Sequence, residues 1–225
     1  MKLSIIIPVL NEADEITDCL TALKPLRRNG HEVIVVDGGS RDETVSLAEP
    51  LCDRCLAGSE RGRAAQMNEG AAVAKGDILL FLHADTRLPL EAEDVLIHSA
   101  DEGYFWGRFD VRLSGQHPLL RVVETAMNLR SRVTGIATGD QAMFVSRALF
   151  DRVGGFPAVP LMEDIALSKT LKQLRPPHCL RHRVITSSRR WQEKGLLRTI
   201  LTMWKLRLMY FLGVSPAKLA RRYED

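Results

Sequence analysis

The stretch Ile78-Leu79-Leu80-Phe81-Leu82-His83-Ala84-Asp85-Thr86 is the one on which the predicted fold depends. Its five leading apolar residues follow Gly76-Asp77 and are typical of a strand buried on both faces. In an open α/β sheet, ligands bind at the carboxyl ends of such strands. Asp85 is therefore expected to meet a cation or a phosphate-bearing substrate, but an aspartate here also suits a turn or a helix N-cap.

The composition is that of an ordinary globular chain. The 225 residues fit one domain, or one domain with a C-terminal appendage, and 45% of them are hydrophobic and 26% charged. A net charge of +3 is too small to indicate a nucleic-acid partner. The four cysteines lack disulfide-type spacing, and we see neither an export signal nor an apolar run near the ~20 residues that cross a bilayer. We therefore expect a cytoplasmic protein.

Strand-like and helix-like segments alternate through the first hundred residues. Strands are expected at 3–7, 33–37, 51–56 and 78–82, and helices begin near Asn11, Asp42 and Arg61. The first helix is expected to stop before Pro25. This alternation predicts an α/β fold with a mostly parallel, Rossmann-like doubly wound sheet.

The pattern changes beyond residue 100. Further strands are expected at 104–113, at 139–145 and around Val184, with helices at 118–133, 147–153, 163–174 and 196–212. The second half is therefore predicted to be a mixed elaboration of the same domain, which extends over 1–195. Residues 196–225 are predicted to form an amphipathic helical appendage.

Three aspartates occupy special places in this pattern. Asp37 and Asp85 end apolar strands, and Asp164 follows Glu163 in the first turn of a helix. Mg²⁺ or Mn²⁺ needs only one or two protein carboxylates where substrate phosphates supply the other ligands, and this role suits Asp85. Glu163-Asp164 offers a carboxylate for deprotonating a hydroxyl nucleophile, although both residues also complement a helix dipole.

Four motifs, in order, resemble those of family 2 glycosyltransferases, which have the GT-A fold. They are Ser4-Ile5-Ile6-Ile7-Pro8-Val9-Leu10-Asn11-Glu12, Val35-Val36-Asp37-Gly38-Gly39-Ser40, Phe81-Leu82-His83-Ala84-Asp85 and Met162-Glu163-Asp164. A finer resemblance, to small bacterial members associated with arsenosugar biosynthesis, depends on residues 61–68 (RGRAAQMN), on His83 and on residues 187–191 (SSRRW). The resemblance implies a nucleotide-sugar half over 1–100 and an acceptor half over 101–195.

The resemblance also implies how the donor is bound. Asp37 would contact the nucleotide base. Pro8, Asn11 and Glu12 would line the same nucleoside pocket. Asp85 would bind the metal, Mn²⁺ or Mg²⁺, that bridges the diphosphate of a nucleotide sugar, for which a uridine diphosphate sugar is the expected form.

For the transfer itself, the resemblance assigns Asp164 as the general base on an acceptor hydroxyl. Attack from the face opposite the leaving nucleoside diphosphate would invert the anomeric carbon. The implied activity is that of an inverting, metal-dependent glycosyltransferase with a small-molecule or lipid-linked acceptor.

His83 departs from the family pattern, because many relatives have an aspartate at this position. A neutral imidazole can donate a hydrogen bond to the donor or ligate a metal, but it brings no negative charge. A hydrogen-bonded strand-end residue without a role is the plain alternative. Ala84 lies within the same donor-binding motif.

The resemblance places other polar residues in the site, and each of them also has a purely structural interpretation. Arg61 and Arg63 flank Gly62 before a helix, where they would contact an anion or form an exposed pair. Asp140 and Gln141 resemble the acceptor-side segment of the family, and Glu163 is expected on the same side of the site. Asp140 also suits a turn. Arg190-Trp191 resembles a motif that contacts diphosphate or acceptor, and also suits a surface cluster.

The last predicted helix has apolar residues at helical spacing with basic residues between them, namely Leu197, Ile200, Leu201, Trp204, Leu208 and Phe211. Such a stripe suits packing on the core, a homodimer surface, or a peripheral contact of 196–212 with the inner face of a membrane.

Two other classes of function compete with the transferase. A sugar nucleotidyltransferase would need a Gly-rich basic loop after the first strand, where this chain has Pro8-Val9-Leu10-Asn11-Glu12. A non-catalytic nucleotide-sugar-binding scaffold would have no need of Asp85 and Asp164 together.

Overall fold

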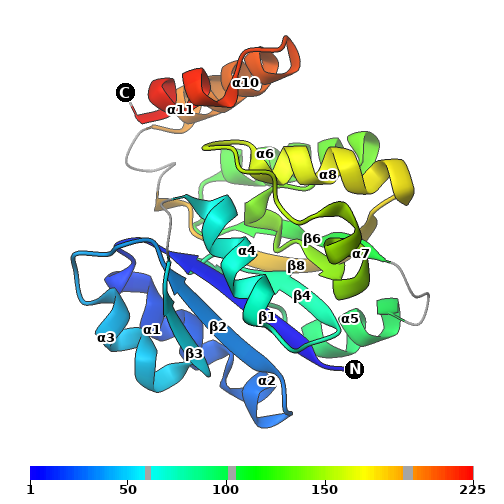
Figure 1. The fold of residues 1–225 in the computed structure, drawn as a ribbon. Coiled ribbons are helices and arrows are strands. Elements are labelled where there is room, and N and C mark those ends of the chain that lie inside the picture. The colour runs from blue at the N-terminus through cyan, green and yellow to red at the C-terminus, as the bar shows by residue number, and fades with distance from the viewer. Residues whose placement is uncertain (59–61, 101–104, 190–194, 225) are drawn as a thin grey trace.

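A computed structural model describes residues 1–58, 62–100, 105–189 and 195–224, which form an α/β protein around one sheet (Figure 1). The sheet has eight strands in the order β3-β2-β1-β4-β7-β6-β8-β5. In chain order they are β1 (Leu3–Val9), β2 (Glu32–Asp37), β3 (Arg54–Ala57), β4 (Ile78–Phe81), β5 (Thr86–Arg87), β6 (Trp106–Leu113), β7 (Phe144–Ser146) and β8 (His178–Thr186).

The sheet is parallel in its first half and mixed in its second. Strands β3, β2, β1 and β4 run parallel to one another. Strand β7 is antiparallel to both β4 and β6, β8 runs parallel to β6, and β5 is antiparallel to β8. The predicted α/β class, with a parallel doubly wound half and a mixed elaboration, is confirmed.

Helices cover both faces of this sheet, which is why its central strands are apolar throughout. One face is covered by α1 (Ala13–Ala22), α3 (Thr44–Ala48), α5 (Ala92–Ala100) and α6 (Pro118–Thr134). The other face is covered by α4 (Arg63–Val73), α7 (Arg147–Val153) and α8 (Glu163–Leu174). Short helices α2 (Lys24–Arg28), η1 (Glu49–Leu51) and η2 (Gly139–Gln141) lie in the connections.

The alternation of side chains along β1 shows how two cores form. Ile5 and Ile7 pack against Leu20 of α1, whereas Ile6 packs with Met67 of α4 on the opposite face. All three isoleucines are fully buried. Since successive side chains of a strand point to opposite faces, a run of apolar residues serves both cores.

Some predicted elements differ from the observed ones. The strand expected at 139–145 is wrong over its first part: Gly139–Gln141 form η2, which Thr138 and Gln141 close with a capping box. Ala142 then has a φ of 47°, which interrupts extended backbone before β7. The first helix does stop before Pro25, as predicted, since α1 ends at Ala22; Pro25 itself lies in the first turn of α2, where a missing N–H costs nothing. Helix α5 and strand β5 were not predicted, whereas α11 (Pro216–Glu224) lies within the appendage that was predicted to be helical.

The C-terminal helices lie beside α6 and α8 at the top of Figure 1. Helix α10 (Leu196–Phe211) packs on α8 through a cluster that includes Leu206, Met209 and Ile165. Its other face leaves large apolar side chains exposed, namely Leu201, Trp204, Leu208 and Phe211. Of the helices in the described part of the chain, none has the length and apolar character to cross a membrane.

Candidate functional site

The carboxyl ends of β1 and β2 are tied together by Gln66 of α4. Its buried Nε2 donates to the carbonyl oxygens of Val9 and Val36, each at 2.8 Å. Gly38 passes so close that a Cβ there would lie 3.0 Å from the same amide nitrogen. Sequence reasoning missed Gln66. The feature that could have pointed to it is a polar amide within a helix that consists largely of small residues.

The loops after β1 and β2 are joined at these strand ends. Asp37 is buried, and its Oδ2 accepts the N–H groups of Gly39 and Ser40, both at 3.0 Å. Asn11, with a φ of 55°, donates its N–H to the Ser40 hydroxyl at 2.8 Å. Pro8 lies one residue before the end of β1, opposite Val36. Asn11 and Asp37 are thus brought together, as expected, from residues far apart in the sequence.

Asp85 follows β4 and is half-buried, with its backbone oxygen accepting the N–H of Ser187 at 3.1 Å. Burial raises the pKa of Glu12, and the carboxylate of Asp85 raises that pKa further. Arg189 and Arg63 act in the opposite direction. The two carboxylates therefore share one region at the ends of β1 and β4.

His83 packs directly against Gly139 of η2. A Cβ on Gly139 would lie 2.6 Å from the Nε2 atom of His83, so the close approach requires a glycine. Burial, together with the Arg63 guanidinium, lowers the pKa of His83 to about 4. The imidazole is therefore neutral at physiological pH. Ala84 is buried, and its carbonyl oxygen accepts from Nη1 of Arg87 at 2.9 Å.

Asp164 lies in the first turn of α8, which begins after Met162 in the left-handed conformation. Its Oδ2 accepts the N–H of Gly139 at 2.9 Å, and its Oδ1 accepts that of Ile165 at 2.7 Å. Burial raises the pKa of Asp164, and these two N–H groups lower it in part. Gly139 thus links Asp164 to His83 at the end of β4.

Glu163, beside Asp164, is buried next to a cation. Its pKa is raised by burial and by the Asp164 carboxylate. The guanidinium of Arg63, at the start of α4, lies 4.0 Å from its Oε1 and offsets part of this shift. Arg63 is half exposed, so it still presents donors toward the site.

One small pocket contains parts of both carboxylate motifs. It is lined by His83 from the end of β4, Gly139 from η2 and the pair Glu163-Asp164 from α8, with apolar walls that include Met67 and Phe156. The structure therefore brings together two motifs that are about eighty residues apart in the sequence.

The other predicted site residues have different surroundings. Asp140 is half-buried and accepts from the Thr138 hydroxyl at 2.6 Å. Gln141 is fully buried, and its amide is used by Thr138 and Asn128, so in this structure it holds η2 in place rather than facing a ligand. Arg61, Arg190 and Trp191 lie outside the described residues.

A divalent cation would find few ligands in the protein itself. Within the described ranges, no group of three or more His, Cys, Asp or Glu side chains is arranged to hold a metal ion. Asp85 and Glu12 nevertheless place two mutually repelling carboxylates at one strand-end region. Such a donor set fits Mg²⁺ or Mn²⁺ where a bound diphosphate and water complete the coordination.

The fold places the chain among GT-A glycosyltransferase structures. It aligns with S. aureus TarS 1-349 in complex with UDP-GlcNAc at a TM-score of 0.67 and 20% identity, over 84% of this chain and 59% of that one. It aligns with the mannosyltransferase PcManGT from Pyrobaculum calidifontis, in complex with GDP-Man and Mn²⁺, at a TM-score of 0.65 and 23% identity, over 91% and 60% of the two chains.

Residues 4–151, more than half of the chain, match the glycosyl transferase family 2. The chain belongs to that family. It is 32% identical over 152 residues to the undecaprenyl-phosphate 4-deoxy-4-formamido-L-arabinose transferase of Yersinia pestis bv. Antiqua (strain Angola), over 62% of this chain and 46% of that protein. The chain thus spans about half the length of the curated relatives that it matches.

Proposed function

We propose that this protein is a glycosyltransferase that moves a sugar from a nucleoside diphosphate sugar to an acceptor hydroxyl with inversion. The observation that carries the proposal is the pocket in which the end of β4 meets the first turn of α8 through Gly139. A donor bound at the strand ends and an acceptor activated by Asp164 would meet there.

The donor side of the proposal is supported by the loops after β1, β2 and β4. Asp37 and Asn11 are held in position by backbone contacts between two loops, which suits recognition of a nucleoside. Uridine diphosphate is the proposed carrier. Among the related structures, one is described with UDP-GlcNAc and another with GDP-Man, so the base needs a direct test.

The chain's own residues do the following in the proposed reaction. Asp164 accepts the proton of the acceptor hydroxyl, for which a carboxyl with a raised pKa is better suited than an ordinary aspartate. The hydroxyl oxygen bonds to the anomeric carbon as the bond from that carbon to the diphosphate breaks. Arg63 and neutral His83 would donate hydrogen bonds to the departing diphosphate.

A divalent cation held by Asp85, with Glu12 nearby, would supply positive charge to the diphosphate of the leaving group. This proposed metal dependence is supported by the chemistry of the two carboxylates. It is also supported by the Mn²⁺ described for the related mannosyltransferase.

The proposal is tested by following products. Purified protein is incubated with UDP-, GDP- and TDP-sugars, Mn²⁺ or Mg²⁺ and a panel of acceptors, and the release of nucleoside diphosphate is measured. We expect acceptor-dependent release with one preferred base and, by NMR, an inverted anomeric configuration in the product. Pyrophosphate release from a nucleoside triphosphate and a sugar phosphate would instead identify a nucleotidyltransferase. Donor binding without release in every acceptor condition would identify a binding scaffold.

A further inference from the structure

A second cavity, of about 210 Å³, lies between α6, α8 and α10, next to the turn that carries Asp164. Its apolar walls are Ile165 of α8, Trp204 and Phe211 of α10, and Ile136, which follows α6 in the chain. Two arginines, Arg130 of α6 and Arg207 of α10, complete the lining. The cavity therefore combines an apolar wall with two positive charges.

The two arginines lack a carboxylate partner. Within the described ranges, neither forms an ion pair, and the Nε of Arg130 is buried without a hydrogen-bond acceptor. The Nη2 of Arg130 donates a hydrogen bond to the Thr138 hydroxyl at 3.3 Å. Burial, and then the positive charge of Arg207, lowers the pKa of Arg130 to about 10. Two guanidinium groups without a carboxylate partner in one partly buried cavity favour an anionic ligand, and phosphate is an anion that arginine binds through paired hydrogen bonds.

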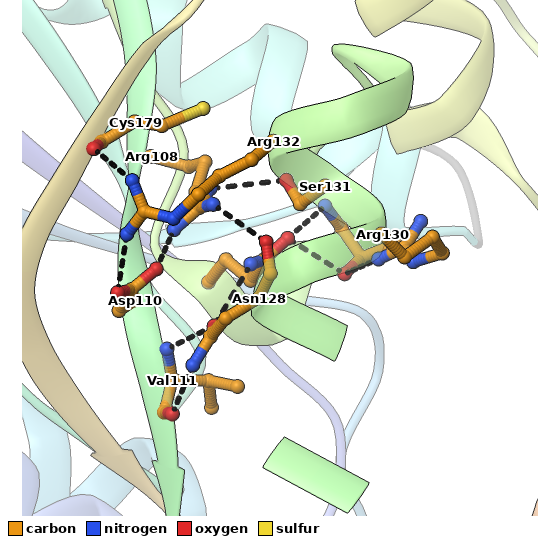
Figure 2. Close-up of polar contacts among 10 residues, drawn as sticks. Arg108, Asp110, Val111, Asn128, Arg130, Ser131, Arg132 and Cys179 are labelled. Atoms are coloured by element: carbon orange, nitrogen blue, oxygen red, sulfur yellow. Dashed lines mark hydrogen bonds and ion pairs between the residues drawn. The ribbon is translucent and has the colours of Figure 1, made fainter. Parts of the chain in front are cut away.

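Arg130 is directed into this cavity by the packing of α6. Figure 2 shows its side chain pointing away from the cluster in which Arg108 and Arg132 converge on Asp110. Asp110 is thus already paired with Arg108 and Arg132, whereas Arg130 lines the cavity.

The arginines of the cavity interact electrostatically with the carboxylates of the proposed reaction site. Arg207 lowers the pKa of Asp164, and the carboxylates of Asp164 and Asp140 act on Arg130 in return. An anionic group bound between the two arginines would thus lie beside the proposed general base. This is the place that an acceptor must occupy.

The outer side of the cavity continues into exposed apolar surface. Trp204 and Phe211 are 67% and 57% exposed, and Leu201 and Leu208 lie on the same stripe of α10. On α6, Leu129 and Val133 are also exposed, on either side of Arg130 in the sequence. Exposed apolar side chains gathered beside a charged cavity favour a ligand with both a charged head and an apolar chain.

We propose that the cavity between α6, α8 and α10 binds the acceptor, and that the acceptor is a lipid phosphate. Its phosphate lies between Arg130 and Arg207, and its chain runs over Trp204 and Phe211. The inference rests on the proposed function and names its acceptor class. It agrees with the undecaprenyl phosphate in the name of the relative from Yersinia pestis.

The transfer to such an acceptor balances without a further reactant. A bond forms between the P–OH oxygen of the lipid phosphate and the anomeric carbon, while the bond from that carbon to the diphosphate of the donor breaks. The electron pair of the broken bond leaves with the nucleoside diphosphate. The proton of the P–OH group, which is the acceptor hydroxyl, passes to Asp164.

The test measures binding alone, by calorimetry with farnesyl phosphate and without donor. Two matched probes each lack one part of this ligand: farnesol lacks the charged phosphate, and inorganic phosphate lacks the apolar chain. We expect farnesyl phosphate to bind more tightly than either. Arg207→Ala should weaken this binding about tenfold or more, since it removes charge-assisted hydrogen bonds, while Lys205→Ala on the exposed side of α10 should not change it.

The apolar surface of the proposed site is tested with Trp204→Ala. The control is Leu90→Ala, at an almost fully exposed leucine elsewhere in the chain. Trp204→Ala should lower the affinity for farnesyl phosphate and leave the affinity for inorganic phosphate unchanged. Thermal unfolding of each variant shows that it is folded. Because no turnover is needed, and because Asp164→Asn removes a negative charge beside the bound phosphate, this variant should bind farnesyl phosphate at least as tightly as the wild type, so that failure of the transfer reaction and failure of this inference are separate results.

Three outcomes would overturn the inference. One is equal affinity of the wild type and Arg207→Ala for farnesyl phosphate. Another is inorganic phosphate binding as tightly as farnesyl phosphate, which would mean a site for small anions. The last is a dimer in sedimentation velocity that Trp204→Ala dissociates, which would mean that a second copy of the chain covers this surface.

Discussion

At the scale of the residue, Asp164 carries the sharpest expectation. Asp164→Asn retains the hydrogen bonds from Gly139 and Ile165 to an oxygen but cannot accept a proton. We expect kcat to fall about 10²- to 10⁴-fold while donor affinity is unchanged, as measured by product release and calorimetry. Asp151→Asn, at an exposed carboxylate of α7, is the control and should keep full activity. Undiminished turnover of Asp164→Asn would exclude the general-base role.

The pH dependence of transfer should report the same carboxyl. Burial, and to a lesser degree Asp140, raises the pKa of Asp164, and the ionised form is the active base. The rate should therefore increase with pH through this raised pKa, at a higher pH than an ordinary aspartate would need. The charged and titratable groups around it are Glu163 on its own helix, Asp140 on η2, Arg130 on α6, and Arg207 and Tyr210 on α10.

Asp140→Asn gives this pH dependence a directional test. Removing the negative charge of Asp140 lowers the pKa of Asp164, so the acidic limb of the kcat profile should move to lower pH. An unmoved limb would show that another group controls the profile.

At Gly139, the close contact with the His83 ring leaves no room for a larger side chain. The added Cβ of Gly139→Ala would lie 2.6 Å and 2.7 Å from two atoms of the His83 ring, so either η2 or the imidazole must move. We expect transfer to fall at least about tenfold, because small displacements of reacting groups are costly. Gly154→Ala is the contrasting variant: nothing lies near its Cβ, but its φ of 79° makes it strained, so it should lower stability and leave KM unchanged.

At the scale of the element, a buried polar network fixes α6 to the sheet (Figure 2). Arg108 of β6 is fully buried and pairs with Asp110, and its Nε donates to the Ser131 hydroxyl of α6 at 3.0 Å. Arg132 of α6 also pairs with Asp110, while Asn128 exchanges two hydrogen bonds with the backbone of Val111. The network sets both the height and the rotation of α6, and with it the direction of Arg130.

Asp110→Asn should therefore be among the most destabilising of the substitutions considered. It leaves Arg108 as a buried charge without its partner, a change that typically costs about 3–5 kcal/mol. Chemical denaturation measures the free energy of unfolding. Asp14→Asn, which breaks an exposed contact with Arg189, should leave that free energy unchanged. A similar result for the two variants would contradict the structural role of the network.

At the scale of the whole molecule, donor and metal should stabilise the fold together. A ligand at 100 times its Kd adds about 2.7 kcal/mol to the stability of the state that binds it. We expect UDP and Mn²⁺ together to raise Tm by more than the sum of the increases that each causes alone. Asp85→Ala should remove this excess, and Asp94→Ala, at an exposed carboxylate of α5, should retain it. An excess that survives Asp85→Ala would place the metal elsewhere.

Much of this architecture could be predicted from local patterns. The apolar runs at Leu3–Ile7 and Val33–Val36 predicted β1 and β2, and the helical spacing from Glu163 predicted α8 with its observed bounds. Prediction failed where local signals conflict with tertiary contacts. The strand predicted over 139–145 begins too early, because the capping by Thr138 turns Gly139-Asp140-Gln141 into η2.

The sequence by itself determined most of the strands and helices and the carboxylates at the strand ends, because periodicity and burial act over neighbouring residues. Only the tertiary structure decided which of these carboxylates meet. The bond from Gly139 to Asp164 spans 25 residues, and the packing of Gly139 on His83 spans more. The cavity of Arg130 and Arg207 likewise exists only once α10 packs on α8. Such contacts depend on the packing of whole elements against one another, which no local pattern encodes.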